Sequence, residues 1–236
     1  RDVADLRGVE SDHDARLAGG ERPHGRRPES ERDQAVEGGG RAAAQEVADR
    51  MVSAGIGRNI SIKLTQLGLD VSPEVAGLNL RRILALARAD DFFVRIDMEN
   101  SPYTDLTIDV LETVWNIGYR NVGTVIQSYL KRSTKDVERL NAMGVRVRLV
   151  KGAYREPREV AFQQKSEVDA AFVELMRLLL RDGNYPAIAT HDPAMVDATT
   201  AYAAQQRIAK DKFEFQMLYG IRRDLQTSLS REGYPF

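Results

Sequence analysis

The sequence has 236 residues, a formal net charge of −1 and no cysteine. This near-neutral balance gives no overall field that would draw the chain to nucleic acid or to an anionic membrane. The absence of cysteine excludes disulfides, thiolate metal sites and a cysteine nucleophile, and it agrees with a cytoplasmic location. No apolar run approaches the roughly 20 residues that a spanning helix needs, so we expect no transmembrane segment and no nucleic-acid partner.

Residues 1–48 differ in composition from the rest of the chain. Arg, Gly, Glu, Asp and Ala dominate this segment, which has no aromatic residue and no isoleucine. Such a composition buries too little apolar surface to offset the entropy that is lost on ordering. Two interpretations stay open, a disordered or non-homologous tail and a stretch read out of frame, and we place no function in it.

From residue 49 onward, short apolar runs alternate with amphipathic stretches. The apolar runs predict strands at residues 60–64, 92–97, 122–127, 145–150, 187–190 and 213–216. The amphipathic stretches predict helices at residues 73–88, 105–117, 134–143, 166–181, 193–205 and 221–230. Ser72 and Pro73 mark a helix start, whereas Gly118 and Gly144 mark helix ends.

The regular alternation of strand and helix predicts an α/β fold with parallel strands. Two architectures compete, a (β/α)8 barrel and an open doubly wound sheet. Open sheets that bind nucleotides usually carry a glycine-rich fingerprint or a phosphate-binding loop, and neither follows any predicted strand. Polar residues instead end six successive strands, and a barrel gathers all strand ends around one mouth. We therefore expect a TIM-like barrel, incomplete because six strands do not close an eight-stranded barrel.

The sequence VRVRLVKGAY at residues 145–154 raises a specific question. Arg146 and Arg148 lie in a strand that should be buried, so either the strand is an edge with a solvated face or positive charge lies where a ligand binds. Arg148 is nearer to the barrel mouth, whereas the sequence suggests no partner for Arg146. Gly152 would let the backbone approach a ligand closely.

Three other strand ends allow both a functional and a structural interpretation. Lys63 is either a lysine that snorkels from an edge strand or an amine for a Schiff base or for a substrate carboxylate. Asp97 is either a loop former or a charge partner that positions Lys63 or a substrate ammonium. Gln127 suits the edge of a heteroaromatic ring, and equally a bond to a nearby loop backbone.

Thr190 and His191 come directly before a helix start marked by Asp192 and Pro193. Because a helix N-terminus attracts anions, this pair could hold a phosphate. A capping loop with an incidental histidine explains the same residues. We expect no metal site in the chain.

Several of these motifs together resemble one family. The stretches SIKLTQLGLD, RIDMEN, VIQSYLKR, RLVKGAY, ATHD and FEFQMLYG occur in the order and approximate spacing of proline dehydrogenase, over residues 50–236. The resemblance implies a flavin-dependent (β/α)8 enzyme of proline catabolism. It would oxidise L-proline to Δ1-pyrroline-5-carboxylate by hydride transfer to N5 of FAD.

On the substrate side, the resemblance implies four residues. Lys63 would contact the proline carboxylate, and Asp97 would lie beside the substrate and hold the arginine pair that binds it. Tyr154 would form a wall of the proline pocket, and Leu218 would supply an apolar wall. Asp97 and Arg148 are the expected catalytic residues.

On the cofactor side, the resemblance implies a longer set of FAD-binding residues. Arg148 would lie near N5, Gln127 would bond the ring, and Thr190 with His191 would meet the phosphate or ribitol region. The full set is Met98, Gln127, Arg148, Lys151, Gly152, Ala153, Thr190, His191 and Gln216.

The sequence also departs from the family pattern. In the family a final helix carries a tyrosine and two adjacent arginines that clamp the substrate, and the sequence ends at Phe236 before that helix. Arg222 and Arg223 are interpreted as a solvated helix start. We expect a tail at 1–48 and a partial barrel at 49–236, with poor proline binding even where FAD binds.

The expected partners are L-proline and a quinone or other electron acceptor, with peripheral association at the inner face of the membrane. Two other enzyme classes stay open. One is another flavin barrel, similar to methylenetetrahydrofolate reductase, and the other is an aldolase barrel with a Schiff base on Lys63 or Lys151. A non-catalytic remnant is the third alternative.

Overall fold

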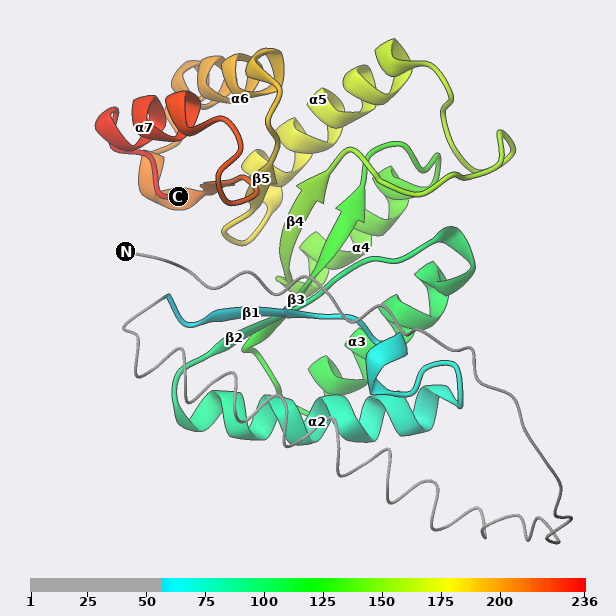
Figure 1. Ribbon diagram of the computed structural model, residues 1–236. Coiled ribbons are helices and arrows are strands. Elements are labelled where there is room, and N and C mark those ends of the chain that lie inside the picture. The colour runs from blue at the N-terminus through cyan, green and yellow to red at the C-terminus, as the bar shows by residue number, and fades with distance from the viewer. Residues whose placement is uncertain (1–56) are drawn as a thin grey trace, which may run out of the picture.

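The protein folds around a curled sheet of six parallel strands, seen in a computed structural model that describes residues 57–236 (Figure 1). The strands lie side by side in chain order. They are β1 (Asn59–Ile62), β2 (Phe93–Ile96), β3 (Val122–Gln127), β4 (Arg146–Val150), β5 (Ala187–Ala189) and β6 (Glu214–Gln216). The segment 1–48 lies outside the described residues, so its interpretation as a tail stays a prediction.

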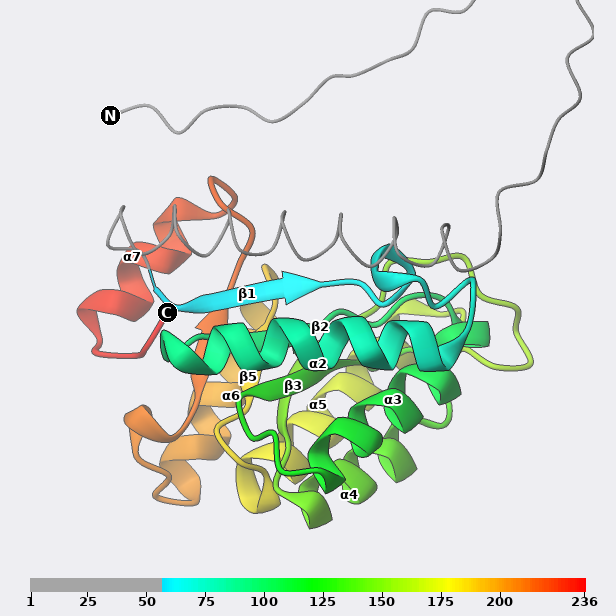
Figure 2. The same cartoon turned by 90° about the horizontal axis from the view of Figure 1, so that it is seen from below.

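Helices connect the strands, and α2 to α5 follow the outer, convex face of the sheet (Figures 1 and 2). The α-helices are α2 (Pro73–Ala89), α3 (Thr104–Asn116), α4 (Ser133–Met143), α5 (Lys165–Asp182), α6 (Pro193–Gln205) and α7 (Arg223–Arg231). Three short 3-10 helices are η1 (Thr65–Leu67), η2 (Ser101–Tyr103) and η3 (Lys210–Lys212). No helix in this part of the chain is long and apolar enough to cross a membrane.

Two helix starts that the sequence predicts are capped by side chains. Ser72 Oγ accepts a hydrogen bond from the N–H of Val75 at 3.2 Å, and Pro73 follows it. Asp192 caps α6 in the same way, because its Oδ1 accepts from the N–H of Ala194 at 3.0 Å. Each cap satisfies a backbone donor that the first helical turn leaves without a partner.

The convex face of the sheet is the hydrophobic core. Val94 and Ile96 of β2 and Val147 and Leu149 of β4 are almost fully buried and belong to one apolar cluster with the helices. In β3 every residue is buried. Because successive side chains of a strand point to opposite faces, the residues between these apolar positions face the concave side.

The curl of the sheet brings strands that are far apart in the sheet order into side-chain contact across the concave face. Arg148 of β4 donates to Ser61 of β1 at 3.1 Å and to Gln216 of β6 at 2.6 Å. Arg95 of β2 lies 3.9 Å from a carboxylate oxygen of Glu214 on β6. A flat open sheet would hold these strands apart, so the predicted barrel-type α/β architecture is confirmed as a curled part of a barrel.

Arg146, for which the sequence suggests no partner, lies between two aromatic rings. Its guanidinium carbon is 4.5 Å from the ring centre of Phe93 and 4.4 Å from that of Tyr185. Arginine over an aromatic face is a favourable arrangement that needs no carboxylate. Arg95 is fully buried beside the same Phe93 ring, and burial lowers the pKa of Arg95 to about 9.

Two predicted boundaries differ from the structure by two residues, and the others agree with it to within one residue. The strand predicted at 60–64 ends at Ile62, because the N–H of Lys63 donates to Gln66 Oε1 at 3.3 Å and η1 begins at Thr65. The helix predicted at 221–230 begins at Arg223, because Arg222 adopts a left-handed φ of 55°. Lys63 therefore lies at the junction of strand and loop.

Candidate active site

A cavity of about 700 Å³ lies at the C-terminal ends of the strands. Its size falls within the range of about 300 to 1,000 Å³ that is usual for sites of small molecules and cofactors. Every residue predicted from the sequence to bind substrate or cofactor lines this cavity. They are Lys63, Asp97, Met98, Gln127, Arg148, Lys151, Gly152, Ala153, Tyr154, Thr190, His191, Gln216 and Leu218.

Arg148 is the centre of the polar contacts at the cavity floor. In addition to its bonds to Ser61 and Gln216, its Nη1 donates to Asp97 Oδ1 at 3.0 Å in an ion pair. Burial lowers the pKa of Arg148 and raises the pKa of Asp97, although the positive charge of Arg148 opposes the shift of Asp97. The floor therefore presents a guanidinium whose orientation is fixed from three strands.

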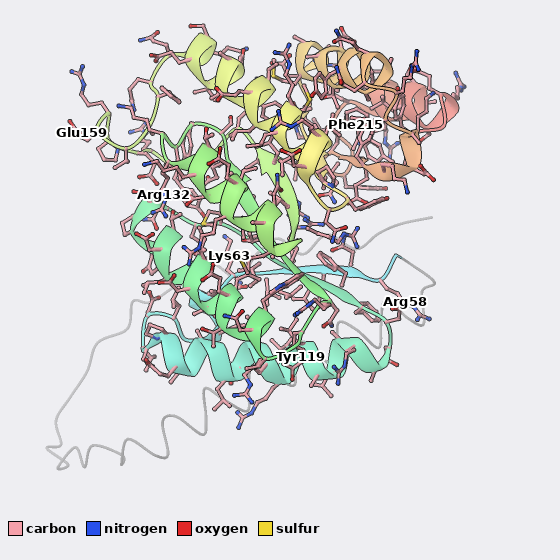
Figure 3. The ribbon with its side chains drawn as sticks, turned by 180° about the vertical axis from the view of Figure 1, so that it is seen from behind. Arg58, Lys63, Tyr119, Arg132, Glu159 and Phe215 are labelled. Carbon is pink, nitrogen blue, oxygen red and sulfur yellow. The ribbon has the colours of Figure 1, made fainter. Side chains whose placement is uncertain are left out.

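The ammonium of Lys63 has no carboxylate at ion-pair distance within residues 57–236. The pairing of Lys63 with Asp97, which the sequence suggested, is wrong in detail, because Asp97 forms its ion pair with Arg148. Lys63 still acts on Asp97 at longer range and lowers its pKa, although less than Arg148 does. An unpaired cation at the rim of a cavity suits an anionic group of a ligand. Figure 3 shows Lys63 on the sheet side of the helical layer.

Gln127 is almost fully buried at the end of β3. Its Nε2 donates to the carbonyl of Glu99 at 2.9 Å, which is the loop-backbone bond that one interpretation predicted. Its Oε1 has no donor among the described residues. One half of the amide thus fixes the side chain, and the oxygen stays available to a ligand.

Gly152 has a left-handed φ of 125°. A Cβ atom at this position would lie 2.5 Å from the ring of Tyr129, which packs against the glycine. The ring of Tyr129 is therefore one close approach that requires glycine here, which the sequence did not suggest. Gly152 nevertheless lines the cavity, and its predicted contact with the cofactor stays a prediction.

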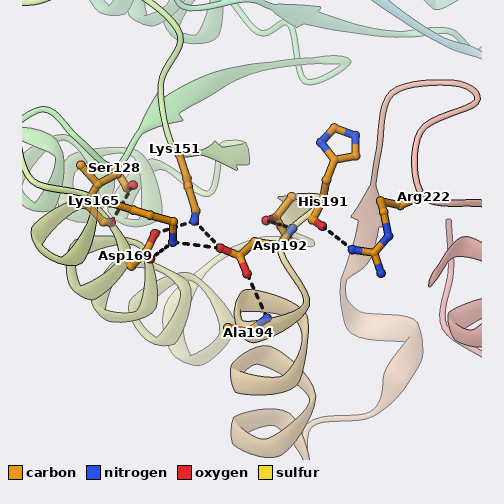
Figure 4. Close-up of polar contacts among 10 residues, drawn as sticks. Ser128, Lys151, Lys165, Asp169, His191, Asp192, Ala194 and Arg222 are labelled. Atoms are coloured by element: carbon orange, nitrogen blue, oxygen red, sulfur yellow. Dashed lines mark hydrogen bonds and ion pairs between the residues drawn. The ribbon is translucent and has the colours of Figure 1, made fainter. Parts of the chain in front are cut away.

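Lys151 is held by two carboxylates at one side of the cavity (Figure 4). Its Nζ donates to Asp169 of α5 and, at 2.7 Å, to Asp192 at the start of α6. This hydrogen bond holds the pKa of Asp192 below its usual value. Sequence reasoning missed Asp169, because a carboxylate in the first turns of a predicted helix gives no sign of the side chain it meets.

His191 and Thr190 both have partners within the protein. His191 Nε2 accepts from the N–H of Leu218 at 2.8 Å, and Thr190 Oγ1 accepts from the N–H of Asp192 at 3.1 Å. Arg222 donates to the carbonyl of His191 at 3.3 Å (Figure 4). These bonds join the loop after β5 to the loop after β6, so the two predicted phosphate contacts also have a structural task.

The remaining lining of the cavity is apolar except for Asp192, the partner of Lys151. Val125, Val150, Ala189 and Met217 join Met98 and Leu218 on its walls. Sequence reasoning did not single out the first four, since an apolar residue at a strand end carries no signal that separates a cavity wall from the core. The site therefore combines a cationic floor with apolar walls.

Three comparisons relate the chain to known proteins. The proline dehydrogenase family model matches residues 27–236, a range that begins within the segment 1–48. Proline dehydrogenase 2 of Bacillus subtilis (strain 168) is 44% identical over 176 residues, which are 75% of this chain and 58% of that protein. Proline dehydrogenase of Deinococcus radiodurans is 45% identical over 186 residues, 77% of this chain and 60% of that protein.

Among solved structures, a crystal structure of proline utilization A (PutA) from Bdellovibrio bacteriovorus inactivated by N-propargylglycine is similar, with a TM-score of 0.75. The sequences are 26% identical, and the match covers 87% of this chain and 26% of the other. The chain thus spans somewhat less than two thirds of the length of these curated relatives.

Proposed function

The chain belongs to the proline dehydrogenase family, and on that premise we propose that it serves the flavin-dependent oxidation of L-proline, the first step of proline catabolism. The observation that carries the proposal is the convergence of Arg148, Asp97 and Gln216 in one cavity, which is also lined by Lys63, whose ammonium has no carboxylate partner among residues 57–236. The product of this reaction is Δ1-pyrroline-5-carboxylate.

The residues present suit a flavin, and we propose FAD. The side-chain oxygen of Gln127 has no donor among the described residues, so it can accept a hydrogen bond from a ligand. The edge of a flavin ring carries an N–H group that could donate this bond. Met98, Val125 and Met217 offer apolar contact to a planar ring. The remaining proposed contacts are Arg148, Lys151, Gly152, Ala153, Thr190, His191 and Gln216.

When bound, FAD supplies the two-electron acceptor for a hydride from the proline ring. Arg148 would place positive charge where the accepted electrons accumulate, and its bonds to Asp97 and Gln216 fix it there before the reaction. Preorganised charge of this kind contributes to catalysis because the protein does not have to reorient it.

The substrate is a small zwitterion, and the cavity offers charge of both signs. Lys63 would bind the carboxylate, whereas Asp97 would accept a hydrogen bond from the ammonium. Tyr154 and Leu218 would cover the apolar ring carbons. We also propose that a quinone or another acceptor takes the electrons from the reduced flavin, and that the protein associates peripherally with the inner face of the membrane. Both proposals rest on the family resemblance alone.

The test is the colour of the protein and its response to L-proline. We expect a purified, yellow, flavin-containing protein whose flavin absorption bleaches without oxygen when L-proline is added. A folded but colourless product, or one in which borohydride traps a carbonyl substrate on Lys63, would contradict the proposal and support the aldolase alternative.

A further inference from the structure

Two glutamates connect the segments that follow β1, β2 and β4 at the C-terminal ends of the strands. Glu99, in the loop after β2, accepts from the N–H of Thr65 at 3.4 Å and from its hydroxyl at 3.0 Å. Glu156, in the loop after β4, accepts from the N–H and from the hydroxyl of Ser101, both at 2.6 Å. The loop that follows Asp97 is therefore tied to its neighbours on both sides.

Among the described residues in the exposed part of this loop, Glu156 is the one whose side chain makes a polar contact. Between Gly152 and Glu159, no other side chain has a polar partner in the described part of the protein. The backbone of the stretch is also held from outside, because Lys131 Nζ donates to the carbonyl of Arg158 at 2.7 Å and Gln163 Nε2 donates to the carbonyl of Glu156 at 3.2 Å. Beyond the stretch, the N–H of Phe162 donates to the carbonyl of Tyr129 at 2.8 Å. Among the described residues, Glu156 thus makes the only side-chain contact that ties the part of the loop next to Tyr154 to the loop after β2.

Tyr154 lies two residues before Glu156 and lines the cavity. It is 36% exposed, so packing alone restrains its position only partly. An exposed loop side chain loses conformational entropy when it is ordered. Two hydrogen bonds to an ionised carboxylate are strong enough to hold the backbone next to it in one arrangement.

We propose that Glu156, through its two hydrogen bonds with Ser101, is a positioning residue that holds Tyr154 over the cavity before the substrate arrives. The proposal rests on the proposed function, in which Tyr154 forms a wall of the proline pocket. Glu156 itself does not line the cavity, so its effect would pass through Tyr154. Preorganisation of a binding wall raises affinity and leaves the chemical step unchanged.

The first experiment tests the tether without flavin or proline. Trypsin cleavage after Arg158, an exposed residue of this loop, is compared with cleavage of the same bond in the unfolded chain. We expect Glu156→Ala to raise the cleavage rate of the folded protein about tenfold, because the loop opens more often. Ser101→Ala, which leaves the loop sequence unchanged, should raise it less, and should add nothing in the Glu156→Ala background.

The matched control is Glu159→Ala, which removes the same charge from the same loop. Glu159 is exposed, and its side chain has no polar partner among the described residues (Figure 3). We expect this variant to be cleaved like the wild type once the unfolded-chain correction is made.

The second experiment tests the link to Tyr154 in the flavin-loaded protein. We expect Glu156→Ala to raise the KM for proline about tenfold with kcat within about twofold of the wild type, and Glu156→Gln to lie between. In a Tyr154→Ala background, Glu156→Ala should leave KM unchanged, because the side chain that it positions is gone.

Equal cleavage rates and equal KM values for Glu156→Ala and Glu159→Ala would overturn the inference. A rise in KM that is additive with Tyr154→Ala would overturn the link to Tyr154. If L-proline reduces no flavin even in the wild type, the proposed function fails, and the trypsin comparison alone decides whether Glu156 holds the loop.

Discussion

The two faces of the same six strands differ in almost every physical property. On the convex face, residues such as Val147 and Leu149 pack against helices and have no polar task. On the concave face, their neighbours Arg146 and Arg148 contact aromatic rings, amides and carboxylates. The alternation of β4 thus assigns stability to one side of the strand and ligand contacts to the other.

The concave face also buries a charged side chain at a cost in free energy. Arg95 is fully buried, and none of its three guanidinium nitrogens has a hydrogen-bond partner in the described part of the chain. The helical layer on the convex side buries smaller polar atoms without a partner, such as Thr104 Oγ1 and Asn141 Oδ1, but no guanidinium among the described residues. Unfavourable burial of this kind gathers at functional sites in many proteins, and here the charge of Arg95 interacts with those of Arg148 and Asp97, which line the cavity.

The largest effect on stability should come from the convex face. Leu149 is fully buried in the core cluster, so Leu149→Ala should lower the free energy of unfolding by about 3 kcal/mol, within the usual range of about 2 to 5 kcal/mol. Urea denaturation followed by circular dichroism measures it. A loss below about 1 kcal/mol would show that this face does not carry the core.

Substitution of Arg148, which precedes Leu149 in β4, should instead affect the reaction with L-proline. Arg148→Met keeps the length of the side chain but removes the charge that Asp97 and Gln216 orient. We expect the rate of flavin reduction by L-proline to fall about a hundredfold, equivalent to about 2.7 kcal/mol of transition-state stabilisation. Stopped-flow absorbance measures the rate, with Arg181→Met, on the exposed surface of α5, as the control. An unchanged rate would remove Arg148 from the catalytic site.

A smaller effect is expected in the helical layer. Ser72→Ala removes the side chain that accepts the N–H of Val75 at the start of α2, and should destabilise the protein by about 1 kcal/mol. Ser72→Asp restores an acceptor and should recover most of this loss. Flavin reduction should stay at the wild-type rate in both variants, and a slower rate would show that the two faces are coupled through α2.

The smallest effect should be a pH dependence on the concave face. Burial raises the pKa of Asp97 above 3.8, so above this pH the unfolded chain loses the proton first. Its contribution to stability is therefore lost as pH rises through the folded-state pKa. The difference in unfolding free energy between wild type and Asp97→Asn should fall over that window.

Asp182 provides the comparison of opposite sign. Its hydrogen bond from Arg181 lowers its pKa, so its contribution is present above pH 3.8 and lost as pH falls through the folded-state pKa. With increasing pH, the wild-type minus Asp182→Asn difference should rise below pH 3.8, whereas the Asp97 difference should fall above it. Parallel trends for the two carboxyls would contradict the assignment of burial to Asp97.

The order of strands and helices, and the gathering of polar strand ends in one cavity, could be predicted from the sequence. Both follow from local patterns, since periodicity marks the elements and parallel strands share one end. Lys63, Asp97, Gln127 and Arg148 could be placed together in this way although each alone is ambiguous.

The partners of these residues could not be predicted, because they depend on the curl of the sheet. Ser61 and Gln216 meet Arg148 only because β1 and β6 bend toward β4. The contacts of Asp169 with Lys151 and of Glu156 with Ser101 join loops that no local pattern relates. The need for glycine at position 152 could not be predicted either, because it arises from the ring of Tyr129, which packs against the backbone there.

The most direct test of the account is a crystal structure of the protein with its flavin and a proline analogue bound. We expect the flavin ring in the concave cavity, with Gln127 and Arg148 at its edge and the carboxylate of the analogue at Lys63. A flavin bound on the convex face, for example in the groove between α4 and α5 that Glu138 and Arg177 line, would contradict it.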